Sequence, residues 1–203
     1  MRVIAHTKFD FMKIPAGKVI VENDSPCDSM YLLTNGTVKA ETASSDNGYS
    51  VTEEASALLI IQPENIFGLH QRFRSTFTAS ADTNLIAISK AEVTRLYENF
   101  TVFRLNVTNM LATKVQRQQS RAWNRPPADL RERIVRFFAS HCQYDNGHKV
   151  FKIKMERLGM EVNDSRLDVS RALNSMQRDN LLSLGRGRIV IPSLKRLYEV
   201  TER

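Results

Sequence analysis

The stretch from Phe151 to Ile191 constrains the fold more than any other part of the chain. Its periodicity predicts, in order, a strand at Phe151–Lys154, a helix at about Met155–Val162, a turn at Asn163-Asp164 and a helix at about Ser165–Asp179. A strand pair that turns at Gly185-Arg186-Gly187 follows. This is the order of a helix-turn-helix with a β-hairpin wing, a unit whose second helix enters the major groove of DNA.

The second of these helices has one apolar face and one basic face. Ser165 is placed to cap its N-terminus, with Asp168 three positions on, as in a capping box. The residues that we expect to face the core are Val169, Ala172, Leu173 and Met176. The residues that we expect to contact DNA from the helix are Ser165, Arg166, Leu167, Ser170, Arg171 and Asn174, and from the wing Arg186 and Arg188.

The excess positive charge lies in the same half of the chain. The 203 residues carry a formal net charge of +7. Residues 1–124 contain 13 basic and 12 acidic side chains, whereas residues 125–203 contain 16 basic and 10 acidic ones. A polyphosphate partner requires positive charge where it binds, so this distribution supports DNA binding by the second half.

Neither the cysteines nor the N-terminus point to a secreted or membrane protein. Cys27 and Cys142 are far apart and belong to no paired motif, which excludes a disulfide framework and a CxxC site. The N-terminal segment lacks the apolar core of a signal peptide, and no apolar run reaches roughly 18 residues. We expect a cytoplasmic protein.

The first half of the chain predicts an all-β module followed by a long helix. Short strand-like runs separated by turns fill about Phe9 to Ser89, with Asn35-Gly36 as the strongest hairpin signal, and they suit a small barrel or β-roll. A capping box at Ser89–Glu92 then starts a helical region that continues to about Trp123 and breaks near Asn99–Thr101.

A narrow stripe on the second part of this helix predicts a homodimer. Its members, at spacings of four, four, three and four, are Val107, Leu111, Val115, Gln118 and Ala122. The alternative is that the stripe packs on the chain's own barrel. Asn124-Arg125-Pro126-Pro127 should end the helix and form a hinge. We therefore predict a sensor domain at 1–124, with its dimerisation helix at about 101–124, and a DNA-binding domain at 125–203.

The chain resembles the CRP/FNR superfamily of bacterial transcription regulators along nearly its whole length. The similarity rests on the Ser165–Leu173 helix, Asp179–Leu182 and the wing, and in the first half on Ile14–Gly17, Tyr31–Val38, Asn65–Gly68 and Thr76–Leu85. It implies an α+β fold with a cupin-like, cyclic-nucleotide-binding-like β-roll, a long dimerisation helix and a winged helix-turn-helix. It also implies a homodimeric, effector-responsive regulator that binds a palindromic operator and contacts RNA polymerase, and that is not an enzyme.

The effector site that the resemblance implies departs from the pattern for cyclic nucleotides. Members that bind them carry Phe-Gly-Glu, whose acid accepts from the ribose hydroxyl, and a later Arg-Ser or Arg-Thr that binds the cyclic phosphate. The corresponding residues here, our candidates for an effector pocket, are Phe67, Gly68, Leu69, Arg74 and Ser75. Leucine cannot accept a hydrogen bond, and a buried group left unpaired costs about 1–3 kcal/mol. We therefore expect an effector other than cyclic AMP.

Other cofactors and functions are also disfavoured. The chain lacks the N-terminal cysteine cluster of the iron–sulfur members, which excludes that cluster. Haem would need an axial ligand, and His6, His70 and Cys27 are isolated. We expect no metal and find no catalytic constellation. Two alternatives remain: a constitutive DNA-binding regulator with a vestigial pocket, and a ligand-binding or enzymatic cupin-like barrel with an incidental basic tail.

Overall fold

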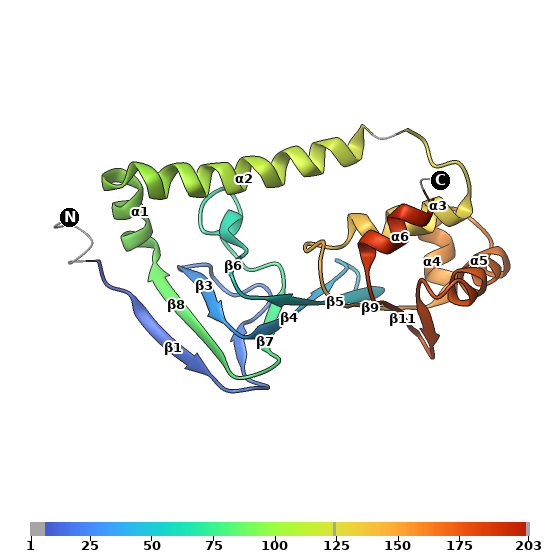
Figure 1. Ribbon diagram of the computed structural model, residues 1–203, viewed down its shortest axis with the longest axis horizontal. Coiled ribbons are helices and arrows are strands. Elements are labelled where there is room, and N and C mark those ends of the chain that lie inside the picture. Colours follow the sequence, from blue (N-terminus) through green and yellow to red (C-terminus); the bar gives the residue numbers. More distant parts are fainter. Residues whose placement is uncertain (1–6, 124, 202–203) are drawn as a thin grey trace. The chain divides into compact units, whose positions relative to one another are not determined.

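The computed structural model describes residues 7–123 and 125–201, which form two compact units (Figure 1). Unit 1 contains residues 7–38 and 56–123, and unit 2 contains residues 39–55 and 125–201. Among the described residues, no helix combines the length and apolar character needed to span a membrane.

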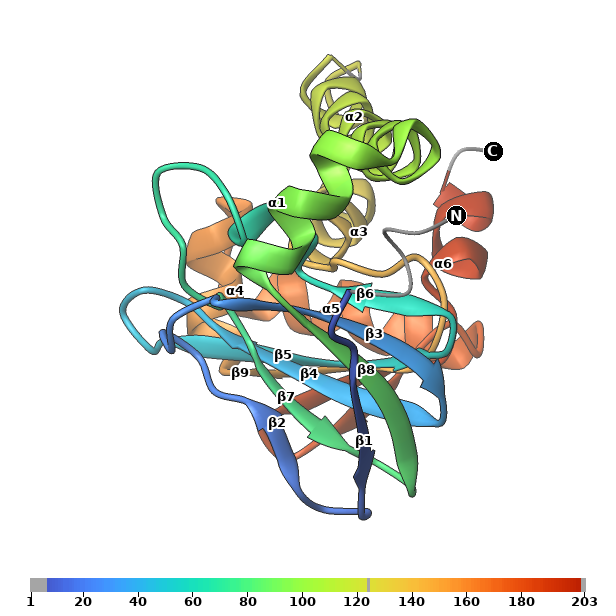
Figure 2. The ribbon, with the colours of Figure 1, turned by 90° about the vertical axis from the view of Figure 1, so that its left-hand side faces the viewer.

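Unit 1 is built on antiparallel strands. Its four-stranded sheet has the order β1 (Asp10–Ile14), β8 (Thr83–Ser89), β3 (Ser29–Asn35) and β6 (Leu59–Ile61), and β2 (Val19–Val21) pairs with β7 (Thr76–Ala79) (Figure 2). Leu33, Ile61, Phe77 and Leu85 are at most 1% exposed and mark the core of the unit. The predicted turn at Asn35-Gly36 is present, with Gly36 at φ 103°, a conformation that favours glycine.

Two helices complete unit 1, α1 (Lys90–Asn99) and α2 (Thr101–Ala122), and a short 3-10 helix, η2 (Pro63–Asn65), follows β6. The predicted capping box is confirmed, because the Glu92 N–H donates to Ser89 Oγ at 3.3 Å. The predicted break is also confirmed: Phe100 has an extended backbone between the two helices. Lys114 of α2 forms an ion pair with Glu64.

Unit 2 combines four helices with a sheet in the order β10-β11-β9-β5-β4. Its strands are β4 (Thr37–Ala43, from Lys39 on), β5 (Tyr49–Ser56, up to Ala55), β9 (Lys149–Ile153), β10 (Ser183–Gly185) and β11 (Arg188–Ile191). Its helices are α3 (Leu130–Ser140), α4 (Met155–Val162), α5 (Arg166–Arg178) and α6 (Leu194–Thr201). Figure 1 shows α3 and α6 on one side of β9 and β11. The core beneath them includes Ile134, Phe138, Phe151, Leu158, Leu173 and Ile189, all at 0% exposure.

The observed units differ from the predicted domains in one segment. The hairpin at 39–55, which we placed in the N-terminal β-roll, clusters with the C-terminal residues. The physical reason is that β5 pairs with β9, from Tyr49 opposite Ile153 to Glu53 opposite Lys149. This pairing joins strands that are far apart in the chain, so local sequence patterns do not reveal it.

A fully buried ion pair fixes one end of this pairing. Glu53 and Lys149 are both 0% exposed, and Lys149 Nζ lies 3.1 Å from Glu53 Oε1. Lys149 Nζ also donates to the Asn146 carbonyl at 2.6 Å. The carboxylate of Glu53 accepts from the backbone N–H groups of Gln143 and Tyr144 at 2.8 and 3.2 Å. Because buried charges are tolerated only when paired and hydrogen-bonded, each of these contacts is needed.

Replacement of Lys149 by methionine should therefore be strongly destabilising. It preserves much of the side-chain volume but leaves the Glu53 carboxylate buried without a cation, which we expect to cost about 3–5 kcal/mol in the free energy of unfolding. The control is Lys152→Met on the same strand, which breaks an exposed pair with Glu41 and should cost only about 0–1 kcal/mol. Urea unfolding measures both, and equal losses would contradict this account of the buried pair.

Candidate nucleic-acid interface

The turn between α4 and α5 is held in one conformation. Asn163 lies in the left-handed region at φ 52°, and the Asp164 N–H donates to the Gly159 carbonyl at 2.9 Å. Gly159 leaves room for the returning chain, since a Cβ there would lie 2.8 Å from the Asp164 carbonyl oxygen. The Asp164 carboxylate forms an ion pair with Arg133 of α3. The turn is thus held by a backbone contact with α4 and by an ion pair with α3.

Helix α5 begins as the sequence predicts. Ser165 is its N-cap: Ser165 Oγ accepts from the Asp168 N–H at 3.0 Å and donates to Asp168 Oδ2 at 2.7 Å. The predicted core stripe is confirmed, with Val169, Leu173 and Met176 at 0% exposure and Ala172 half-buried against the core. One face of α5 is therefore fixed inside unit 2, and the opposite face is available to a partner.

The predicted reading face of α5 is exposed, and weak surface pairs hold its arginines. Arg166 Nε lies 3.2 Å from Glu156 of α4, and Arg171 Nη1 lies 3.2 Å from Asp168. Exposed pairs of this kind contribute about 0–1 kcal/mol, so either guanidinium can exchange its carboxylate for a phosphate or a base edge at little cost. Leu167 is 59% exposed beside them.

The remaining helix candidates lie farther along the same face. Asn174 is exposed and Ser170 is half-buried, and Asn174 Nδ2 donates to the Ser170 carbonyl at 2.8 Å.

The wing is tied to this helix by a residue that sequence reasoning missed. Strands β10 and β11 form the predicted hairpin, with Arg186 and Gly187 in the turn and with Arg186 and Arg188 exposed. Gln177 Oε1 of α5 accepts from the Leu184 N–H of β10 at 2.7 Å. A polar residue near a helix end gives no signal of such a contact in the sequence.

The five effector-pocket candidates do not form a common lining. Leu69 is 98% exposed, which corrects its assignment to a pocket. Phe67 is 40% exposed and lies with its ring edge toward Tyr97. Gly68, between them, is exposed at φ 100°. These three residues lie in the connection between η2 and β7, where the chain is exposed.

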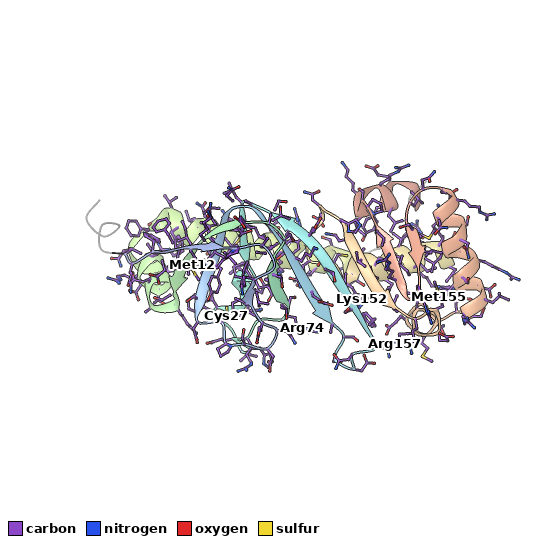
Figure 3. All side chains as sticks on the ribbon, turned by 90° about the horizontal axis from the view of Figure 1, so that it is seen from below. Met12, Cys27, Arg74, Lys152, Met155 and Arg157 are labelled. Atoms are coloured by element: carbon purple, nitrogen blue, oxygen red, sulfur yellow. The ribbon has the colours of Figure 1, made fainter. Side chains whose placement is uncertain are left out.

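The other two candidates are bonded to a buried glutamine that sequence reasoning missed. Ser75 is 0% exposed and Gln62 is 3% exposed, whereas Arg74 is exposed (Figure 3). Gln62 Oε1 accepts from the Arg74 backbone N–H at 2.9 Å, and Gln62 Nε2 donates to Ser75 Oγ at 3.0 Å. An internal amide therefore bonds the Arg74 backbone N–H and the Ser75 hydroxyl, two groups of the segment that the family pattern directs toward a ligand.

The predicted dimer stripe on α2 requires a correction. Val107 is 5% exposed, so it packs inside unit 1 and is not available to a partner. Leu111 is half-buried, Gln118 is exposed and Val115 is 49% exposed, while the side chain of Ala122 lies outside the described residues. One set of exposed residues that recurs at spacings of three, four, three and four and includes Val115 is Leu105, Thr108, Ala112, Val115 and Gln119. The stripe that could meet a partner is thus rotated away from Val107.

Two of the three isolated haem-ligand candidates, Cys27 and His70, lie among the described residues. Cys27 is 1% exposed, and burial, followed by the nearby charges of Asp28 and Glu64, raises the pKa of its thiol to about 11. His70 is exposed, and His6 lies outside the described residues. Within 7–123 and 125–201, no group of three or more His, Cys, Asp or Glu side chains is arranged to hold a metal ion.

Comparison with known families defines the class of the protein. Residues 11–100 match the model of the cyclic nucleotide-binding domain, and residues 132–200 match that of the Crp-like helix-turn-helix domain. A β-rich domain of the first kind, a long helix and a domain of the second kind make up a transcription regulator. The chain belongs to the CRP/FNR family of transcription regulators, which combine these two domains. A search of curated protein sequences gives no significant match.

Solved structures share the fold at low sequence identity. A transcriptional regulator of the crp/fnr family from Eubacterium rectale is 19% identical with a TM-score of 0.56, over 100% of this chain and 93% of that chain. The c-di-GMP responsive global regulator CLP from Xanthomonas campestris is 17% identical with a TM-score of 0.52, over 95% and 97%. A CooA mutant from Carboxydothermus hydrogenoformans is 16% identical with a TM-score of 0.50, over 99% and 90%.

The close approach at Gly159 can be tested by Gly159→Ala. The added methyl group would meet the Asp164 carbonyl oxygen, so the turn must shift, and we expect a loss of about 1–3 kcal/mol in the free energy of unfolding. Met160→Ala, at an exposed position on the same helix, should change it by no more than about 0.5 kcal/mol. Denaturant unfolding compares the two, and a stable Gly159→Ala protein would show that the turn tolerates a Cβ.

Proposed function

We propose that the protein regulates transcription by binding, as a homodimer, a palindromic operator. The observation that carries this proposal is the division of α5 into a buried apolar stripe and an exposed face with Arg166 and Arg171, next to the basic wing. Two such helices related by a two-fold axis read half-sites about one helical turn apart. We place this activity in the cytoplasm, with RNA polymerase as the protein partner on DNA.

The effector is a small molecule other than cyclic AMP. Leu69 supplies no acceptor for a ribose hydroxyl and faces solvent. A phosphate that approached the Arg74 N–H and Ser75 Oγ would have to displace Gln62 from both. The same observation favours a second candidate function, a constitutive DNA-binding regulator whose pocket is closed by its own glutamine.

We expect α5 to recognise the base sequence and the wing to bind DNA without sequence preference. A bidentate arginine–guanine contact contributes about 1–3 kcal/mol of discrimination. Arg171→Ala should therefore weaken operator binding and relax preference at one position of each half-site. Arg186→Ala should weaken all sequences alike and lower the salt slope. Binding selection on randomised DNA, run for wild type and both variants, checks this. An unchanged selected motif for Arg171→Ala, with an altered one for Arg186→Ala, would reverse the assignment.

The corrected stripe on α2 predicts which substitutions give monomers. Leu105 and Val115 are 53% and 49% exposed in one chain, so both can contact a partner helix. In a two-fold seam, Leu105→Glu with Val115→Glu places negative charges of the two helices close to each other, which should prevent dimerisation. Sedimentation should show a monomer, and operator affinity should fall with the loss of the second half-site. Asn106→Glu with Thr113→Glu, on exposed positions away from this stripe, should leave the dimer intact. A dimeric Leu105/Val115 variant would exclude this seam.

Cyclic AMP should show no saturable binding at micromolar concentrations in calorimetry. Displacement of Gln62 leaves a buried amide unpaired, at a cost of about 1–3 kcal/mol. Leu69 supplies no hydrogen-bond acceptor for the ribose hydroxyl that could offset this cost. A useful comparison is c-di-GMP, to which the Xanthomonas regulator responds. Gln62→Ala, titrated in parallel with both nucleotides, shows whether the glutamine is the barrier. Saturable binding of cyclic AMP to the wild type would overturn this exclusion.

A further inference from the structure

The hairpin of β4 and β5 comes from the first half of the chain but belongs to the sheet of the wing. Strand β5 pairs with β9, and β9 pairs on its other side with the wing strand β11. The opposed residues Val51, Phe151 and Ile189 form a row across the three strands and are 3%, 0% and 0% exposed. The wing and the hairpin are therefore parts of one sheet with a common buried face.

The hairpin also contacts the end of α3. Tyr49 Oη lies 2.8 Å from His141 Nε2, and the Tyr49 ring packs edge-on against Phe137, with centroids 5.5 Å apart. Glu53 accepts from the backbone of the segment that follows α3, as described above. These contacts join the hairpin to the helix that packs against both α4 and α5.

The loop of the hairpin reaches the first helix of the helix-turn-helix. Arg157 Nη1 of α4 donates to Asp46 Oδ2 at 2.6 Å, and its guanidinium lies 5.5 Å from the centroid of the Tyr49 ring. Figure 3 shows Arg157 beside the loop at the end of β4 and β5. Arg157 Nε also donates to Glu161 of its own helix at 2.8 Å. The guanidinium is thus fixed from the helix on one side and from the hairpin on the other.

The Asp46 carboxylate that binds Arg157 is held in place by hydrogen bonds within its own loop. Ser44 Oγ donates to Asp46 Oδ1 at 2.7 Å, and the Gly48 N–H donates to the same oxygen at 3.0 Å. Together with Arg157, these donors lower the pKa of Asp46 to about 2, so the group is charged at neutral pH. The loop needs no rearrangement to present a charged acceptor to α4.

We infer that the β4–β5 hairpin positions α4, and through it the recognition helix α5. The hairpin lies within the segment that matches the cyclic nucleotide-binding domain, and it also supports the helices of the DNA-reading unit. Asp46 and Arg157 are positioning residues, which act on DNA binding through the helix and not by contact with DNA. The inference rests on the proposed DNA binding and adds a component to it that lies outside the winged helix.

A purely electrostatic role and a positioning role of Asp46 predict opposite changes in operator affinity for Asp46→Asn. The asparagine oxygen can still accept from Ser44 and Gly48, but the ion pair with Arg157 is lost. Removal of a negative charge by itself strengthens binding to every DNA sequence. Loss of positioning instead weakens binding to the operator. We expect operator affinity to fall about fivefold, the equivalent of one exposed ion pair, while affinity for random DNA stays the same or rises slightly.

Glu41→Gln is the matched control. It removes the same charge from the same hairpin, but Glu41 pairs with Lys152 of β9 and not with α4. We expect it to strengthen binding to operator and random DNA slightly and equally. Arg157→Gln, which breaks the contact from the helix side, should lose operator preference as Asp46→Asn does. Thermal melting of each variant shows that the fold is retained.

Two outcomes would overturn the inference. One is that Asp46→Asn behaves as Glu41→Gln does on both DNAs. The other is that hydrogen exchange of the α4 amides in DNA-free protein is unchanged by Asp46→Asn, because a helix released from its anchor should exchange faster. If binding selection with the wild type yields no operator, the proposed function fails. The exchange measurement then still decides whether the hairpin holds α4.

Discussion

The pairing of β5 with β9 is the interaction on which the DNA-reading part of this protein depends. Strand β9 lies between the hairpin and the wing and contributes Phe151 and Ile153 to the core. Its backbone is satisfied on both sides, and the Glu53–Lys149 pair fixes the register at one end. A shift of one residue would bring both charges out of alignment and turn the buried row toward solvent. The buried pair therefore specifies register, whatever its net contribution to stability.

Helix α5 combines a rigid attachment with easily exchanged surface contacts. Its apolar side chains are fully buried, and its turn from α4 is fixed at Gly159 and Asp164. Its arginines are held only by exposed carboxylates. A reading surface needs both properties, because the helix must keep its place while its polar groups trade protein partners for bases and phosphates. The division follows from the 3.6-residue period of the sequence.

The parts of the structure that were predictable from sequence are those with local causes. The bounds of α4, the cap at Ser165, the stripe of Val169, Leu173 and Met176 and the break before α2 follow from periodicity and capping. The exposed face of α5 followed from the same periodicity. Pairing between distant strands has no such signal, and for this reason the sequence did not show that the hairpin at 39–55 clusters with the C-terminal residues.

The same limit applies to single side chains. A polar residue such as Gln62, between an apolar strand and a proline, gives no indication that it will be buried and bonded to residues 12 and 13 positions later. The Val107 stripe failed for a related reason. Apolar residues occur on more than one face of α2, and spacing alone does not tell which of these faces is buried within the chain.

The position of Gln62 affects which molecules can bind at the Arg74 N–H and Ser75 Oγ. A tethered amide competes with free molecules at an effective concentration typically about millimolar, which exceeds that of most signalling nucleotides. The loop at Arg74 and Ser75 is thus held by two hydrogen bonds that the chain itself provides. A single substitution at Gln62 would therefore remove both of these hydrogen bonds at once.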